Sequence, residues 1–214
     1  MSKEIKLNWG KGAKVNFYLK ILTVIKPERF FHAYLLCRKF ESIINMTTKE
    51  LDFDKIITIV KDDPILLVTN KINTNLINSQ EILVNNLIKK IEGFISCTFD
   101  ITSSNINTQQ QFTQLIENAF VNLNSQVQEN VYFYKENEKQ TSYRYNVLFV
   151  FEKESFVTIL PMEFDVIVNA SKESVLKLTS KDIVTYEQVA VKALNIIHLI
   201  TEDNFNFLTM LKSH

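Results

Sequence analysis

The chain has 214 residues and a mass of 25.0 kDa, a length that fits one large domain or two small ones. Hydrophobic residues make up 46% and charged residues 22%, which is the balance of a folded globular protein and excludes a disordered chain. The 24 basic and 24 acidic side chains cancel, so the chain lacks the global positive field that favours nucleic acid as a partner. If the partner is lipid, affinity must come mainly from buried apolar surface, which favours neutral headgroups.

Residues 1–14 are basic and polar and predict an N-terminal arm. No apolar stretch of about 7 to 15 residues with a small-residue cleavage site follows them, so we expect no secretory signal. No window of about 18 apolar residues without charges is present either. We therefore expect a protein made soluble in the cytoplasm, without a helical membrane anchor.

Apolar spacing in the first half of the chain predicts two helical hairpins. Alternation predicts a strand over residues 15–25, and spacings of three and four predict a helix from Pro27 to about Asn45. A short helix over 51–60 would complete the first hairpin, and the apolar run 65–68 suits a short buried strand.

The second hairpin has two candidate N-caps. Ser79 is predicted to cap a helix that runs to about Cys97. Thr108 and Gln111 form a capping-box pattern ahead of the clearest amphipathic stretch, which ends near Leu123.

From Val131 the apolar period changes from about 3.6 to 2, which predicts a run of strands. The series 143–151 and 156–168 alternate over their full length, and 174–179 and 183–191 continue the pattern. Pro161 indicates an edge strand or a bulge, because proline cannot donate to a ladder. Helical hairpins followed by antiparallel strands predict a single α+β domain whose sheet is covered on both faces.

Residue patterns for catalysis are sparse. The chain has no G-x-S-x-G, H-E-x-x-H or C-x-x-C motif, and Gly10-Lys11-Gly12 lacks the spacing of a phosphate loop. We expect no catalytic residue, no metal and no cofactor. His32 and His198 are interpreted as partly buried structural residues.

Two further side-chain groups have a structural and a functional interpretation. Cys37 and Cys97 are interpreted as inert core thiols, with a disulfide or a reactive thiol as the alternatives. Glu163 and Asp165 fall on one face of a strand and are interpreted as its solvated face, with an acid–base pair as the alternative.

The strands carry the functional hypothesis. A membrane-crossing strand needs roughly 9 to 11 residues of alternating polarity, and the two long series satisfy this length. The apolar faces of the helices shield the sheet in water and are equally suited to a membrane interface.

Several short stretches, in order, resemble the Cyt cytolytic δ-endotoxin family. The specific part comprises FVNLNSQ (120–126), YFY (132–134), SYRYNVLF (142–149), FDVIV (164–168) and SVL (174–176). The looser likeness spans residues 15–200, with 27–45 similar to the family's first long helix. The resemblance implies a three-layer domain, in which a central, mainly antiparallel sheet is wrapped by two helical hairpins.

The resemblance also implies a membrane-permeabilising toxin that binds neutral phospholipids, forms homodimers or oligomers, and inserts as pores or disrupts the bilayer. It implies storage as an inclusion or release, trimming of residues 1–14 and 201–214 around a domain at 15–200, and action at the membrane of a target cell. The proposed membrane-insertion residues are Tyr143, Tyr145, Val147, Phe149, Phe151, Phe156, Thr158, Leu160, Met162, Phe164, Val166, Val168, Val189 and Val191. The proposed helical cover and interface residues are Phe30, Phe40, Leu87, Ile91, Phe112, Ile116 and Phe120.

Two other functions stay open at this point. One is a non-lytic lipid- or protein-binding module with the same fold. The other is an enzyme in which His32 or His198 lies near a carboxylate in a polar cleft.

Overall fold

A six-stranded sheet forms the centre of the molecule in the computed structural model, which describes residues 20–26, 29–40, 42–125, 131–153 and 156–199. The strands are β1 (Lys20–Val24), β2 (Leu66–Leu83), β3 (Val131–Glu136), β4 (Thr141–Lys153), β5 (Phe156–Val168) and β6 (Ile183–Leu199). Their order is β1-β4-β5-β6-β2, and β3 also pairs with β4. The β1–β4 pairing is parallel and the others are antiparallel, as the prediction of a mainly antiparallel sheet requires.

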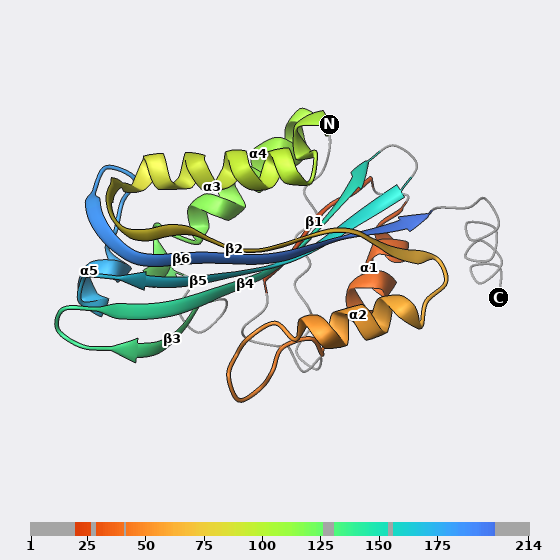
Figure 1. Cartoon of the computed structure of the whole chain (residues 1–214). Coiled ribbons are helices and arrows are strands. Elements are labelled where there is room, and N and C mark those ends of the chain that lie inside the picture. The colour runs from red at the N-terminus through yellow and green to blue at the C-terminus, as the bar shows by residue number, and fades with distance from the viewer. Residues whose placement is uncertain (1–19, 27–28, 41, 126–130, 154–155, 200–214) are drawn as a thin grey trace.

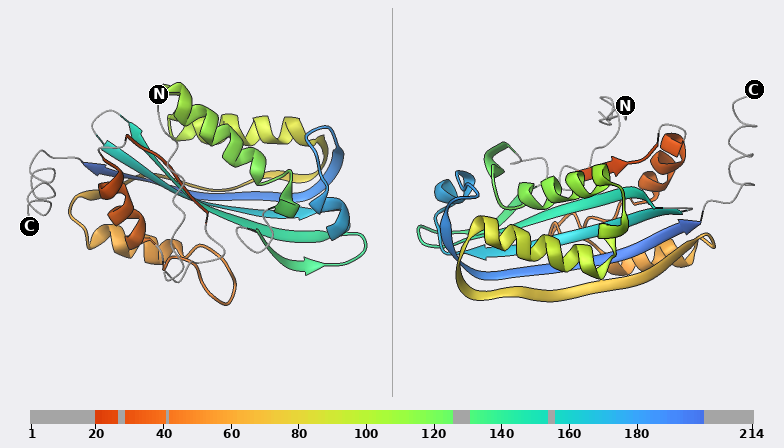
Figure 2. Two further views of the ribbon diagram at one scale, coloured as in Figure 1. Left: turned by 180° about the vertical axis from the view of Figure 1, so that it is seen from behind. Right: turned by 90° about the horizontal axis from the view of Figure 1, so that it is seen from above.

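Four helices form two layers, one on each face of this sheet (Figure 1). They are α1 (Phe30–Lys39), α2 (Phe53–Lys61), α3 (Val84–Thr98) and α4 (Ile106–Asn118), and a short helix α5 (Lys172–Leu176) connects β5 to β6. Helices α3 and α4 cover one face and α1 and α2 the other, which Figure 2 shows from behind and from above. The predicted three-layer α+β architecture is confirmed.

Two buried apolar clusters hold the layers together. The larger lies between the sheet and α3–α4, and the smaller lies between the sheet and α1–α2. Both arise because the side chains of β4, β5 and β6 alternate between the two faces and are apolar on each.

The largest error of the sequence prediction concerns β2. Residues 69–83 were expected to be loop and helix, and Ser79 a helix cap, but all of them lie in an 18-residue strand. The segment is rich in asparagine, which is unfavourable in strands. Pairing with β6 along its length outweighs that preference, with bulges between Val68 and Asn70 and between Asn75 and Ile77.

Helix limits also differ from the prediction. Helix α1 ends at Lys39 instead of Asn45, and α4 ends at Asn118 before Phe120 and Leu123, which are nevertheless buried. Helix α4 begins three residues earlier than the capping box indicated. Its N-cap is Asn105, whose side-chain oxygen accepts a hydrogen bond from the Thr108 backbone N–H at 2.9 Å.

Two predictions about the last strands were wrong. Pro161 lies in β5, a central strand, where Leu160 and Pro161 pair with β4 but not with β6. The missing proline N–H is thus accommodated by a local lapse in the β5–β6 ladder. The start of segment 174–179 belongs to α5, where the Ser171 side chain caps the helix by accepting from the Ser174 N–H.

The cysteines and histidines have different environments. Cys37 is buried, as predicted, but Cys97 is exposed on α3, and neither forms a disulfide. The prediction failed for Cys97 because it lies on the solvent side of an amphipathic helix. His198 is fully buried in β6, while the side chain of His32 and the two chain ends lie outside the described part of the structure.

The cap of α4 gives a direct test of the corrected helix start. Asn105→Ala is expected to lower the free energy of unfolding by about 1 kcal/mol, because the Thr108 N–H loses its acceptor. Thr108→Ala is the matched control and is expected to be nearly neutral, since its buried hydroxyl has no hydrogen-bond partner among the described residues. Urea unfolding of both variants measures this. A larger loss for Thr108→Ala would restore the capping-box assignment.

Candidate functional site: the two faces of the sheet

The residues proposed for membrane insertion lie on one face of the sheet, beneath α3 and α4. The β4–β5 register places Tyr145 opposite Phe164 and Phe149 opposite Leu160, so the two alternating series share this face. The residues from β6 join them through pairs such as Phe164 with Val191. Thirteen of the fourteen are buried, and Phe156 at the strand end is half-buried.

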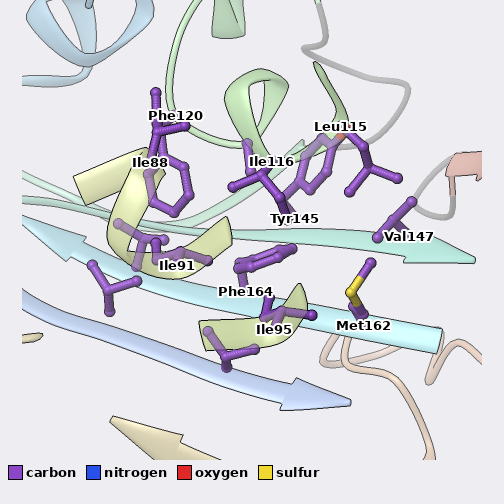
Figure 3. Close-up of a cluster of buried hydrophobic side chains, with 14 of the residues drawn as sticks. Ile88, Ile91, Ile95, Leu115, Ile116, Phe120, Tyr145, Val147, Met162 and Phe164 are labelled. Atoms are coloured by element: carbon purple, nitrogen blue, oxygen red, sulfur yellow. The ribbon is translucent and has the colours of Figure 1, made fainter. Parts of the chain in front are cut away.

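Helices α3 and α4 fill this face with their own apolar stripes (Figure 3). Of the residues proposed for the cover, Leu87, Ile91, Phe112, Ile116 and Phe120 are all almost completely buried. The ring of Phe112 lies 5.6 Å from that of Phe149. The ring of Phe120 packs edge-on against Phe164 and Tyr186, at centroid distances of 6.1 and 6.3 Å.

Contacts across this interface are almost entirely apolar. A hydrogen bond from the Tyr143 hydroxyl to the Ala119 carbonyl oxygen, at 3.1 Å, is an exception at the end of α4. Burial raises the pKa of Tyr143, so this hydroxyl stays a donor. Hydrocarbon could therefore take the place of α3 and α4 against most of this face of the sheet.

The opposite face is divided between an apolar and a polar half. In the apolar half, Phe40 and its neighbours on α1 and α2 pack on Leu148, Val150, Ile159 and Ile196. Of the two cover residues proposed on this side, Phe40 is fully buried, whereas the side chain of Phe30 is outside the described part.

The polar half contains a cluster of charged and amide side chains, which we call the polar cluster: Arg144 and Asn146 of β4, Glu163 and Asp165 of β5, and Lys192 of β6. Glu163 pairs with Asn146 across β4–β5 and with Lys192 across β5–β6 in the strand register. Its carboxylate accepts from the Lys192 ammonium at 3.0 Å. Arg144 lies 3.6 Å from Asp165 and 4.3 Å from the centre of the Tyr134 ring.

This arrangement corrects the interpretation of Glu163 and Asp165 as a solvated face. Glu163 is 0% exposed, because the linker between α1 and α2 covers it. Asp165 is largely covered and accepts a hydrogen bond from the Tyr134 hydroxyl at 2.6 Å. Alternation along β5 places both carboxylates on one face, but what covers them depends on tertiary neighbours: the linker covers Glu163, and Tyr134 and Arg144 lie against Asp165.

Residues 48–51 of that linker bind the polar cluster directly. The backbone N–H of Leu51 donates to Glu163 at 2.7 Å. The carbonyl oxygens of Thr48 and Lys49 accept from Arg144 at 2.7 Å and Asn146 at 2.8 Å. The Glu50 carboxylate pairs with Arg144 at 2.8 Å. None of these linker contacts follows from local spacing, so the sequence pattern does not predict them.

Burial raises the pKa of Glu163, and the hydrogen bond from Leu51 and the ammonium of Lys192 oppose this without cancelling it. The folded protein consequently holds the Glu163 proton more tightly than the unfolded chain. The stability contributed by this group is complete below its ordinary pKa of 4.5 and is lost as the pH rises through the higher folded value.

A pH series on Glu163→Gln tests this sign. The free energy of unfolding of the parent, minus that of Glu163→Gln, is expected to fall as the pH rises above about 4.5, by about 1.4 kcal/mol for each unit that the folded pKa is raised. The curve then levels off. Groups such as Asp63, with a lowered pKa, titrate in both proteins and cancel in the difference. A difference that increases with pH would show that pairing outweighs burial.

Within the described residues, no helix has both the length and the apolar character needed to cross a bilayer. The described residues also include no group of three or more His, Cys, Asp or Glu side chains arranged to hold a metal ion.

Comparison with known proteins identifies relatives over most of the chain. The chain is 31% identical over 186 residues to the type-2Ba cytolytic delta-endotoxin of Bacillus thuringiensis subsp. israelensis, covering 85% of this chain and 69% of the relative. It is 28% identical over 194 residues to the type-2Bb cytolytic delta-endotoxin of subsp. jegathesan, covering 89% and 73%.

A solved structure shows the same fold. The crystal structure of the activated Cyt2Ba monomer from Bacillus thuringiensis subsp. israelensis superposes with a TM-score of 0.80 at 29% identity, covering 86% of this chain and 99% of that one. The model of the family described as Bacillus thuringiensis toxin matches residues 1–213. From its sequence and its fold, the chain belongs to the Bacillus thuringiensis toxin family, among the cytolytic delta-endotoxins.

Proposed function

We propose that this protein is a cytolytic toxin that binds membrane phospholipids and permeabilises the bilayer without enzymatic chemistry. One observation carries the proposal. Strands β4, β5 and β6 have 13, 13 and 17 residues and present a continuous apolar face, most of which is covered by helices α3 and α4. About 9 to 11 residues suffice for a tilted strand to cross the hydrocarbon core.

The exchange of helices for lipid is physically feasible at this face. In water, each buried apolar side chain of Leu or Phe size contributes about 1.5 to 3 kcal/mol, which holds the helices on the sheet. Acyl chains offer the sheet an equivalent apolar environment, and the helices can place their own apolar stripes in the interface. Little free energy is then lost when lipid replaces the apolar contacts between helices and sheet. In water the same contacts keep the helices on the sheet.

Zero formal net charge supports neutral phospholipid as the membrane partner. Assembly of several copies is part of the proposal for a different reason. Among the described strands, β2 is paired on one side only, with β6. Unpaired backbone groups are costly in hydrocarbon, so an inserted sheet needs a further strand at this edge, which a second copy can supply.

Trimming of the chain ends also belongs to the proposal. The activated Cyt2Ba monomer is matched over 99% of its length by 86% of this chain, which supports a compact core with additional terminal residues. We propose residues 1–14 and 201–214 as the removable segments around a domain at 15–200.

The enzymatic alternative has little support from His198, since a fully buried imidazole in β6 is not accessible to a substrate in this state. The non-lytic binding module is the remaining alternative. It shares membrane binding with the toxin hypothesis but not leakage.

Dye release from phosphatidylcholine vesicles tests the proposal. The full-length chain and a chain limited to residues 15–200 are added to vesicles that contain a self-quenched dye, with vesicle sedimentation measured in parallel. We expect binding and dye release at micromolar protein, and release at lower concentration for the shortened chain. Binding without release from either chain would favour the non-lytic module. The absence of both binding and release would refute membrane action on neutral lipid.

A further inference from the structure

The two helical layers are attached to the sheet by different kinds of contact. Beneath α3–α4 the sheet presents apolar side chains, of which Phe149, Leu160 and Val191 are typical. On the other face, the linker between α1 and α2 is bound to Arg144, Asn146 and Glu163 by hydrogen bonds and an ion pair. The difference matters because lipid can replace only one of these kinds of contact.

The linker contacts are buried and specific. Glu163 is fully buried, and its carboxylate has its partners in Leu51 and Lys192. Lys49 adopts a left-handed backbone conformation with φ of 56°, which is unfavourable for a residue with a side chain. Its carbonyl oxygen accepts from Asn146, and its N–H donates to Asn45, so bonds on both sides fix this turn.

Acyl chains can take the place of α3–α4 but not of the linker. Exposing the polar cluster to hydrocarbon would remove the Leu51 N–H and the Thr48 and Lys49 carbonyl oxygens from their partners. It would also leave charged side chains in a medium that cannot solvate them. The α1–α2 layer therefore resists exchange for lipid, although its apolar contacts alone would permit it.

The way in which the α3–α4 hairpin is attached allows it to separate from the sheet. Both chain ends of this hairpin lie near the loop before β6, where the N–H groups of Val84 and Asn122 donate to the carbonyl oxygens of Asp182 and Leu178. The opposite end, between α3 and α4, is held by solvent-exposed contacts of Asp100 with Lys153 and of Thr98 with Asn70. Exposed contacts of this kind are weak, so the hairpin can pivot about its chain ends.

We propose that membrane binding separates the α3–α4 hairpin alone, so that the sheet meets acyl chains through the face under α3–α4. The α1–α2 layer stays seated on the polar cluster. This inference rests on the proposed function and deepens it, because it assigns the lipid-facing side of the sheet and the layer that leaves.

Tryptophan substitutions at neighbouring positions of β4 distinguish the two faces. Phe149→Trp places an indole under α3–α4 and Leu148→Trp places one under α1–α2, at nearly the same position along the strand. Both are made in a Trp9→Phe background, which removes the single native tryptophan. The probe is a vesicle of phosphatidylcholine with brominated acyl chains, which quench an indole on contact.

We expect vesicle binding to quench the fluorescence of the Phe149→Trp variant and to leave that of the Leu148→Trp variant unchanged. Leu148→Trp enlarges a packed side chain, so Phe40→Trp provides a second probe of the same layer through an aromatic exchange at the C-cap of α1. It is expected to remain unquenched as well. Thermal unfolding verifies that each variant is folded before lipid is added.

Other patterns of quenching contradict the inference. Equal quenching of all three variants would mean that both layers leave the sheet. Quenching of only Leu148→Trp and Phe40→Trp would mean that α1–α2 leaves. Dye release without quenching of any variant would mean that the sheet does not reach the acyl chains. If the parent protein releases no dye, that separate result would refute the proposed function itself.

Discussion

A sheet whose central strands are apolar on both faces cannot be exposed to water, and this constraint organises the whole molecule. Tyr145 and Val147 of β4 point to one face, while Leu148 and Val150 point to the other, and all four are buried. Each face thus requires a cover, which the chain supplies as one helical hairpin per face. The same constraint makes the protein suited to a membrane, since a cover that is needed only in water can be replaced by lipid.

The two covers are not equivalent, and the polar cluster is the reason. Helices α3 and α4 lie on a face whose side chains are apolar along three strands. The linker between α1 and α2 lies on buried Glu163 and its neighbours, where removal of one partner of a buried ion pair typically costs about 3 to 5 kcal/mol. A sheet built in this way has one side that can face hydrocarbon and one that must keep its protein cover or water.

The sequence predicted features that depend on local periodicity and missed those that depend on distant partners. The limits of β5 were predicted to the residue, because every second residue from Phe156 to Val168 is apolar or threonine. Strand β2 was missed, since its asparagine-rich sequence becomes a strand only beside β6. Glu163 was assigned to solvent because alternation gives the face of a residue but not the loop that covers it. Alternation along each strand selected the proposed insertion residues, but their common position on one face, beneath α3–α4, follows only from the strand register and the fold.

Persistence of the polar cluster in the membrane-bound protein is the central claim, and hydrogen exchange at the Leu51 amide measures it most directly. This N–H is bonded to the Glu163 carboxylate at 2.7 Å, so its exchange is slow only while the linker remains on the sheet. Mass spectrometry of peptides that span residues 48–53 can compare the free protein with protein bound to phosphatidylcholine vesicles. Equal protection in both states is expected. Loss of that protection on vesicles that are being permeabilised would contradict the claim.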